Sequence, residues 1–343
     1  CPCALVISVP LGFFGGIGAA SRMGVLVKGS NYLEAVAEMT TIVFDKTGTL
    51  TKGEFKVQDV FPEKGSQQEL LELAALGEGY STHPIAGSIR EAYGREPDLS
   101  RVGQALEIPG EGICIPVDGK ETLIGNEKLL QERGIPFTPC EKPGTVVYVA
   151  CAGESRGAIL ISDTVKEGAK EAILSMRQVG VKKCVMLTGD RNQAAQAVAR
   201  ELGLDEAHAQ LLPGEKVEKV EELLAARRGK EKLAFAGDGI NDAPVLTRAD
   251  IGIAMGSMGS DAAIEAADVV LMDDDVRKIA AVVRLSRKTL RIVKQNIVFA
   301  LGVKALVLIL GAFGLANMWE AVFADVGVSV IAILNSMRAL KSE

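Results

Sequence analysis

The chain has 343 residues, of which 48% are hydrophobic, 4% aromatic and 24% charged, with 37 glycines and a formal net charge of −6 at pH 7. This length allows two or three domains, and the acidic balance excludes a general nucleic-acid-binding surface. The six cysteines lack the dense spacing of a secreted disulfide scaffold. The composition favours glycine-rich α/β units joined to membrane segments.

The first expected element is an apolar helix that opens with Cys1-Pro2-Cys3 and carries no charge over residues 1–21. About 20 apolar residues span a bilayer, so we expect a membrane helix with its cytosolic exit ending near residue 28. Proline unwinds a helix locally, which would let both thiolates face one metal ion. The alternative is a pair of small packed residues beside a kink. Since the chain starts without Met and without the basic flank of a signal peptide, we expect a fragment of a longer protein.

The next block predicts a soluble α/β unit that is interrupted by an insert. Short apolar runs alternate with helical patterns, which is typical of a parallel sheet covered by helices on both faces. The expected strands are residues 41–44, 158–161, 184–187, 233–236, 251–254 and 269–271. The long segment between the first two strands has its own helix and hairpin signals and predicts a second domain. The expected domains are 29–57 and 157–276 for the sheet and 58–156 for the insert.

Chemistry-bearing residues follow the ends of these strands. Asp45 ends the first strand, where an aspartate can act as a nucleophile on a phosphoryl group. A hydroxyl for a phosphate oxygen, two carboxylates suited to Mg²⁺ and a neutralising ammonium come from Thr188, Asp238, Asp242 and Lys216. One Asp-Gly turn alone usually marks a plain loop, but four such elements at successive strand ends predict a phosphoryl-transfer site.

The strings DKTGTLT (residues 45–51), TGD (188–190) and GDGIND (237–242) resemble the phosphorylation domain of P-type ATPases, which has a haloacid-dehalogenase-like fold. The resemblance covers nearly the whole chain. It implies that ATP phosphorylates Asp45 and that Mg²⁺ is bound by Asp45, Asp238 and the backbone of Thr47. The other residues that it places around the phosphoryl group are Thr188, Lys216, Asn241 and Asp242.

The insert resembles the nucleotide-binding domain of the heavy-metal subclass of these ATPases. Its string EGYSTHP carries Glu78 and His83, which the resemblance implies contact the adenine of ATP. A histidine before proline is by itself more often structural. Further elements that are similar to the ATP-contacting loops of that domain are Gly110, Gly112, Gly125 and Asn126. Glycines two apart usually mark a turn, so Gly110 and Gly112 alone are weak evidence for a nucleotide site. Their order after His83 is what supports the ATP interpretation.

The string AGES at residues 152–155 is similar to the Thr-Gly-Glu-Ser loop that dephosphorylates members of this family. It lies at the end of the insert, whereas the family carries that loop in an actuator domain upstream of the Cys-Pro-Cys helix. We therefore expect a hairpin turn at 152–155. The actuator domain and the earlier membrane helices are expected in the missing N-terminal half of the full-length protein.

Two further apolar runs, residues 296–316 and 321–337, follow the soluble block. We expect two C-terminal transmembrane helices within residues 277–343. The basic residues that flank these runs are Arg284, Arg287, Lys288, Arg291, Lys294, Arg338 and Lys341. The positive-inside rule then places residues 22–295 in the cytosol. The expected protein is an integral membrane protein in contact with lipid, and the resemblance implies a bacterial cell membrane.

Two ionisable residues inside these runs, Lys304 and Asp325, are candidates for function by their position. Thiolates suit Cu(I), Zn²⁺ and Cd²⁺ alike. A lysine in one span followed by Asp-x-Gly in the next resembles the zinc, cadmium and lead branch, whereas the copper branch has Asn-Tyr and a methionine with serines. We expect Cys1, Cys3 and Asp325 to bind the transported ion and Lys304 to serve as the counter-charge. The alternative for Lys304 is a side chain that reaches to the membrane interface.

The expected function is ATP-driven export of Zn²⁺, Cd²⁺ or Pb²⁺ through an aspartyl-phosphate intermediate. A Cu(I)-exporting ATPase is the alternative within the class. A soluble haloacid-dehalogenase phosphatase is the alternative from another class, and it predicts no membrane spans. A third possibility is that the fragment alone is a membrane-anchored ATP-binding module.

Overall fold

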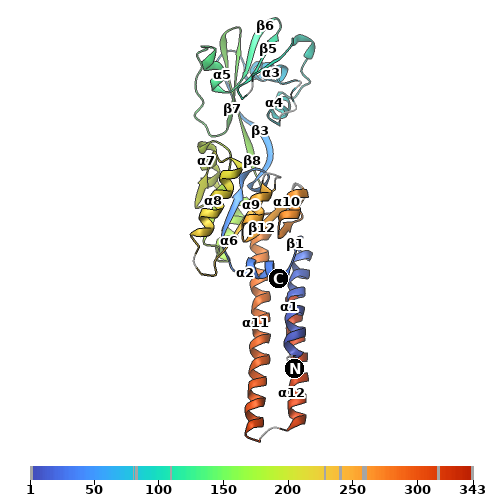
Figure 1. The fold of residues 1–343 in the computed structure, drawn as a ribbon. Coiled ribbons are helices and arrows are strands. Elements are labelled where there is room, and N and C mark those ends of the chain that lie inside the picture. Colours follow the sequence, from blue (N-terminus) through green and yellow to red (C-terminus); the bar gives the residue numbers. More distant parts are fainter. Residues whose placement is uncertain are drawn as a thin grey trace. The chain divides into compact units, whose positions relative to one another are not determined.

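The computed structural model describes residues 3–79, 81, 84–108, 110–227, 229–238, 242–256, 261–314 and 317–340. The chain divides into two compact units (Figure 1). We call one the core unit, which comprises residues 1–50, 167–190 and 199–343. We call the other the insert unit, which comprises residues 51–166 and 191–198.

The core unit contains a seven-stranded sheet with the order β1-β13-β12-β11-β2-β9-β10 in the described part of the chain. Among these strands β1 is antiparallel to β13, and the other neighbours are parallel. The strands are β1 (Val25–Val27), β2 (Met39–Asp45), β9 (Lys183–Leu187), β10 (Glu206–His208), β11 (Lys232–Gly237), β12 (Ile251–Met255) and β13 (Val269–Leu271). β12 and β13 are buried along their whole length, as a parallel sheet covered on both faces requires. The predicted parallel sheet is confirmed for five of the six expected strands.

Helices pack on this sheet and close its hydrophobic core. Val220 and Leu246, which lie on two of these helices, join a cluster of fully buried sheet residues that includes Val43 and Phe235. The helices are α2 (Ser30–Ala37), α6 (Ala169–Gln178), α8 (Pro213–Ala225), α9 (Ala243–Arg248) and α10 (Asp261–Ala266). The helix α7 (Asn192–Leu202) crosses the division between the two units.

The prediction that residues 158–161 belong to the parallel sheet is wrong. They lie in the middle of β8 (Glu154–Val165), which pairs antiparallel with β3 (Thr51–Pro62) and β7 (Thr145–Cys151) in the insert unit. A short apolar run looks the same in a buried strand of either kind of sheet, so the composition of the run could not distinguish the two.

The insert unit contains a six-stranded antiparallel sheet in its described residues, with the order β3-β8-β7-β6-β5-β4. Its remaining elements are β4 (Leu106–Ile108), β5 (Gly112–Val117), β6 (Lys120–Gly125), α3 (Gln67–Gly77), α4 (Pro84–Tyr93), α5 (Glu127–Glu132) and the short 3₁₀ helix η2 (Leu99–Arg101). Cys151 pairs with Glu154 across the two-residue loop between β7 and β8. Ala152 and Gly153 both have positive φ, which matches the twist of a tight hairpin. The predicted hairpin turn at 152–155 is confirmed.

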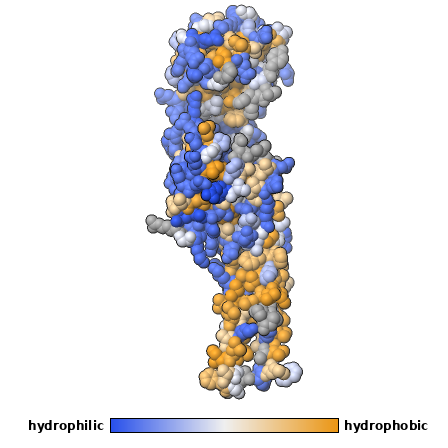
Figure 2. All heavy atoms as spheres, viewed as in Figure 1, coloured by the Kyte–Doolittle hydropathy of each residue, from blue (hydrophilic) through white to orange (hydrophobic). Residues whose placement is uncertain are grey.

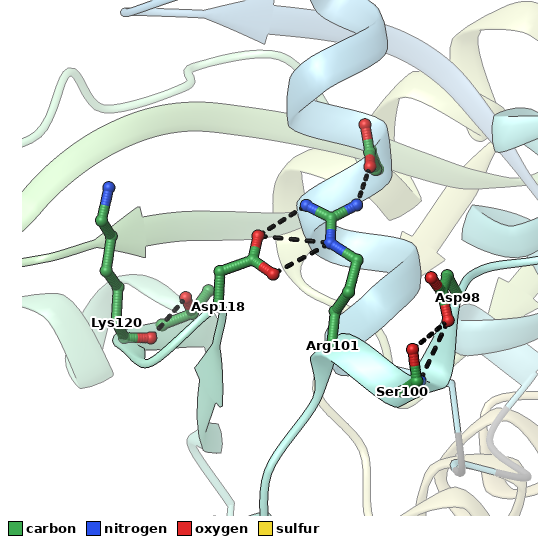
Figure 3. Close-up of polar contacts among 7 residues, drawn as sticks. Asp98, Ser100, Arg101, Asp118 and Lys120 are labelled. Carbon is green, nitrogen blue, oxygen red and sulfur yellow. Dashed lines mark hydrogen bonds and ion pairs between the residues drawn. The ribbon is translucent and has the colours of Figure 1, made fainter.

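An ion-pair network fastens η2 to its neighbours in the insert unit. Figure 3 shows the Arg101 guanidinium facing Asp118, to which Nη2 donates at 2.6 Å. Arg101 Nη1 also donates to Glu72 Oε1 of α3 at 2.5 Å. Asp98 caps η2 by accepting from the amide of Ser100 at 3.1 Å. Arg101 therefore joins η2 to α3 and to the turn between β5 and β6.

Among the described residues, three helices of the core unit are long and apolar enough to cross a membrane. They are α1 (Cys3–Arg22), α11 (Arg277–Ala312) and α12 (Met318–Ser336), the last of which continues into the 3₁₀ helix η4 (Met337–Leu340). Figure 2 shows hydrophobic side chains gathered over these helices. Exposed apolar side chains such as Val298, Leu308 and Phe313 form this surface. The predicted spans are confirmed as candidates for crossing a lipid bilayer.

A buried polar network joins the same three helices. Asn296 Nδ2 of α11 donates to Ser336 Oγ of α12 at 2.8 Å and to the carbonyl of Ala332 at 3.0 Å. Asn335 Nδ2 donates to Asn296 Oδ1 at 2.8 Å, and Ser336 Oγ donates to the carbonyl of Ser8 on α1 at 2.8 Å. Such hydrogen bonds stabilise helix packing where lipid offers no alternative partner.

Candidate active site

The register of the core sheet brings three expected site residues to one edge. Asp45, the last residue of β2, lies opposite Leu187, and Thr188 follows directly. On the other side of β2, Phe44 lies opposite Ala236 of β11, and Asp238 follows two residues later. Because these strands are parallel, their carboxyl ends meet at the same edge, where reacting groups of open α/β sheets lie.

The loop after β2, residues 46–50, turns tightly beside Asp238. Thr47 has φ −72° and ψ 133°, and Gly48 has φ 72° in the left-handed region. A Cβ atom on Gly48 would overlap the carboxylate of Asp238. Glycine is therefore required both by the backbone conformation and by the close approach of Asp238.

A lysine from α8 lies between two of the carboxylates. Lys216 Nζ donates to Asp45 Oδ1 at 2.5 Å and to Asp242 Oδ1 at 3.1 Å. Asp45 and Asp242 are both buried, with 6% and 3% of their surfaces exposed, so water screens this pair weakly. Burial alone would lower the pKa of Lys216, but the carboxylates of Asp45 and Asp242 outweigh burial and the pKa is raised.

The carboxylates outnumber this ammonium. Oxygen atoms of Asp45, Asp238 and Asp242 all lie within 4.8 Å of one another. Burial raises the pKa of Asp45 to about 7, the negative charge of Asp242 adds to the rise, and Lys216 opposes it. The native protein therefore disfavours the ionised form of Asp45, and a further cation bound at this site would stabilise it.

The donor set fits Mg²⁺. Mg²⁺ prefers oxygen ligands and commonly uses one or two carboxylates together with substrate phosphates and water. Asp45 and Asp238 supply such oxygens at one sheet edge, beside the backbone of Thr47. In the same loop the hydroxyl of Thr49 is buried and has no hydrogen-bond partner within the described part of the chain.

Thr188 lies in a loop whose backbone is held firmly. Its amide donates to the carbonyl of His208 at 3.0 Å, and its carbonyl accepts from the amide of Leu211 at 3.1 Å. Its Oγ1 accepts from the amide of Asp190 at 3.1 Å. The hydroxyl proton is therefore available for another acceptor, such as a phosphate oxygen.

One ion pair at this edge could not be anticipated from the sequence. Lys46 Nζ, which is almost fully buried, donates to Asp190 Oδ2. The pair joins the loop after β2 to the loop after β9. Both residues stand within the strings DKTGTLT and TGD, but their spacing gives no sign that the two side chains meet.

In the insert unit the structure brings four of the expected ATP-contacting residues together. Gly112 pairs with Gly125 across β5 and β6, and Asn126 Nδ2 donates to the carbonyl of Gly110 at 2.9 Å. A Cβ atom on Gly112 would overlap the backbone of β6, so the close approach of the two strands already requires this glycine. Glu78 follows α3, and its carbonyl accepts from Arg90 Nη1 at 2.5 Å.

Lys304 and Asp325 line one cavity of about 340 Å³ among α1, α11 and α12. Ala4 and Leu5, which directly follow Cys3 on α1, line the same cavity. The end of α1 that begins at Cys3 thus lines the same cavity as the two ionisable residues of the later spans. The cavity thus brings Ala4 and Leu5 together with Lys304 and Asp325, which lie some three hundred positions later in the sequence.

Some expected site residues lie outside the described residues. These are Cys1, His83 and Asn241. For Cys3 the structure describes the backbone at the start of α1 but not the side chain.

Comparison with known proteins gives the family. A family profile described as haloacid dehalogenase-like hydrolase matches residues 39–250. The cadmium, zinc and cobalt-transporting ATPase of Bacillus subtilis is 55% identical over 99% of this chain and 49% of its own length. The zinc-transporting ATPase of Synechocystis sp. is 56% identical over 99% of this chain and 47% of its own length.

A crystal structure of a zinc-transporting PIB-type ATPase in the E2.Pi state is 39% identical, with a TM-score of 0.85. The match covers 99% of this chain and 56% of that one. The chain spans about half the length of the curated relatives that it matches. The resemblance to heavy-metal P-type ATPases is confirmed over the whole chain, and the chain belongs to the haloacid dehalogenase-like hydrolase family.

Proposed function

We propose that the full-length protein is a P-type ATPase that uses ATP to export a divalent heavy-metal ion, Zn²⁺, Cd²⁺ or Pb²⁺, across a membrane. One observation carries the proposal. Lys304 and Asp325 line a cavity between membrane-type helices that belong to the same compact unit as the Asp45 site. The relatives named as cadmium- and zinc-transporting ATPases support this choice of ions.

The chemical step is phosphoryl transfer to Asp45. An oxygen of the ionised carboxylate attacks the γ-phosphorus of ATP, the bond from that phosphorus to the bridging oxygen breaks, and ADP leaves with the electron pair. Lys216, 2.5 Å from Asp45, neutralises charge on the transferred group, and the Thr188 hydroxyl donates to one of its oxygens. Mg²⁺ held by Asp45, Asp238 and the backbone of Thr47 would neutralise the phosphoryl oxygens. Asp242 holds Lys216 in place, and Asn241 completes the site by resemblance.

The insert, proposed as a nucleotide-binding domain over residues 58–156, supplies ATP. By resemblance Glu78 and His83 contact the adenine. The paired strands at Gly112 and Gly125 present backbone to the nucleotide, and Asn126 fixes the turn at Gly110. ATP binding to the full-length protein with and without His83→Ala tests this assignment.

The transported ion is proposed to bind Cys1, Cys3 and Asp325. A carboxylate added to two thiolates favours a borderline divalent ion over Cu(I), which prefers soft ligands alone. The ammonium of Lys304 lines the same cavity and would pair with the carboxylate once the ion has left. This pairing would keep the carboxylate from being left as an isolated charge in apolar surroundings.

The protein is proposed to lie in a bacterial cell membrane with residues 22–295 in the cytosol. Basic residues at the ends of the three spans support this orientation. The spans themselves argue against a soluble phosphatase of the same fold.

The proposal is tested by measuring ATP hydrolysis of the full-length protein in liposomes with Zn²⁺, Cd²⁺, Pb²⁺ and Cu(I). We expect the divalent ions to stimulate hydrolysis and Asp45→Asn to abolish it. Hydrolysis that is independent of metal and survives in Asp45→Asn would refute the proposal, and stimulation by Cu(I) alone would make the protein a copper exporter. Lys304→Ala should impair metal-stimulated hydrolysis, whereas the matched control Lys294→Ala, an exposed lysine of the same helix, should not.

A further inference from the structure

A single arginine connects the long helix α11 to three segments of the core unit. Arg287 Nε donates to the carbonyl of Ala37 at 2.9 Å, and Nη2 donates to the carbonyl of Met39 at 3.3 Å. Arg287 Nη1 donates to the carbonyl of Val179. The guanidinium therefore contacts backbone from α2, β2 and the end of α6 at once.

The positions of these carbonyls explain why a cation lies there. Ala37 is the last residue of α2, and Val179 is the C-terminal cap of α6. The carbonyls at a helix C-terminus lack partners within the helix and carry the negative end of the helix dipole. Arg287 thus neutralises two helix ends. The planar guanidinium can donate to three separate acceptors at once. A lysine at the same position has a single ammonium group, which cannot reach all three carbonyls with good geometry.

The same contact connects two elements that lead to the two proposed sites. Met39 begins β2 and Asp45 ends it, so a contact on Met39 is one strand away from the phosphorylated residue. In the other direction, α11 runs without interruption from Arg287 to Lys304, which lines the ion cavity. At 1.5 Å per residue this distance is about 25 Å along the helix.

We propose that Arg287 is a positioning residue that couples the phosphorylation state of Asp45 to the tilt of α11, and through it to Lys304 in the ion cavity. The inference rests on the proposed function. When the core unit rearranges around a phosphorylated Asp45, the two helix ends and β2 carry the guanidinium with them. Since α11 is one continuous helix, the displacement reaches its membrane half as a rigid-body movement.

An anchoring role alone and a coupling role differ in what their loss does. Loss of an anchor lowers the amount of folded protein and reduces every activity in proportion. Loss of a coupling contact leaves Asp45 able to accept phosphate but removes the dependence of that step on the ion. The decisive quantity is the ratio of Asp45 phosphorylation by ATP with Zn²⁺ to that without Zn²⁺.

The experiment measures this ratio in the full-length protein for Arg287→Met, Arg287→Lys and the control Arg284→Met, which changes an exposed arginine one turn earlier on α11. We expect Arg287→Met to lower the ratio about tenfold, in line with the loss of a charged hydrogen-bonding group, while maximal phosphorylation stays within about twofold. Arg287→Lys should restore part of the ratio, because it keeps the charge at the helix ends. The control should behave as the wild type.

Several outcomes would overturn the inference. An unchanged ratio in Arg287→Met would do so, as would a proportional loss of phosphorylation with and without Zn²⁺. If Arg287→Met fails to fold, a wild-type ratio in Arg287→Lys would overturn the geometric role of the fork. A wild-type protein that phosphorylates Asp45 equally under every metal condition would instead refute the proposed function, and the coupling role with it.

Discussion

Replacing Asp45 by asparagine should stabilise the core unit of the metal-free protein at high pH. The carboxylate is almost fully buried and lies near Asp242 and Asp238, and these surroundings raise its pKa from 3.8 to about 7. The unfolded chain therefore releases the Asp45 proton near pH 4, whereas the native protein keeps it until near pH 7. Between these values the native state binds more protons, so the stability of the wild type falls as the pH rises through this window.

The size of the effect follows from the same shift. A pKa raised from 3.8 to about 7 corresponds to about 4 kcal/mol of lost stability above pH 7, at roughly 1.4 kcal/mol for each pKa unit. The asparagine variant carries no charge and avoids this loss, and the pKa of about 7 already includes the opposing contact with Lys216. A gain of about 4 kcal/mol should raise the unfolding temperature of the core unit by about 8–16 °C at pH 8.

Calorimetry of the full-length protein in EDTA at pH 5 and pH 8 measures this difference. At pH 5 the native carboxyl is protonated while the unfolded one is already ionised, so the gain should fall to about 2 kcal/mol. Addition of Mg²⁺ at pH 8 should stabilise the wild type more than Asp45→Asn. Glu218→Gln, which neutralises an exposed carboxylate of α8, is the matched control and should leave the unfolding temperature unchanged. Identical pH dependence of the wild type and Asp45→Asn would refute the argument that burial destabilises the ionised carboxylate.

Three other substitutions test separate parts of the structure. Gly48→Ala should abolish Mg²⁺-dependent phosphorylation and preserve ATP binding, because the new methyl group would displace Asp238; normal phosphorylation would contradict the close approach of the loop to this carboxylate. Arg101→Met should lower the unfolding temperature of the insert unit at low salt, and the difference should shrink at high salt as the ion pairs become screened. Asn296→Leu should weaken the packing of α1, α11 and α12 by about 1 kcal/mol, measured by unfolding in mixed detergent micelles, since Ser336 loses a buried partner. Unchanged unfolding of that variant would mean that the network contributes nothing to helix packing.

The sequence was most informative where function and strand ends coincide. Asp45, Thr188 and Asp238 each follow a buried apolar run, and parallel pairing alone then brings them to one edge. The ion pair between Lys46 and Asp190 could not be predicted in this way. It depends on how two loops turn, and loop conformation is not carried by the periodicity that identifies strands.

The same limit explains the misplaced strand. Residues 158–161 have the apolar composition of a buried strand, and they are buried. What decides their sheet is pairing with β3 and β7, which are distant in the sequence. A local pattern specifies that a strand is buried on both faces, but it does not specify the direction of its neighbours.

The helix α11 is longer than the hydropathy pattern alone indicates, and its full length bears on the proposed coupling. The apolar run begins at Asn296, yet the helix begins at Arg277, nineteen residues earlier. In the basic segment the buried positions recur at helical spacing and include Ile279, Val282, Val283, Ser286, Leu290 and Val293. The basic residues therefore lie on a helix that packs against the core unit with one face and enters the membrane without a break. Because α11 is one continuous helix, we expect movement of the core unit to reach Lys304 by tilting or shifting α11 as a whole. Arg287 lies where α11 meets the core unit and bonds to α2, β2 and the end of α6 at once, which makes it the contact best placed to control this tilt.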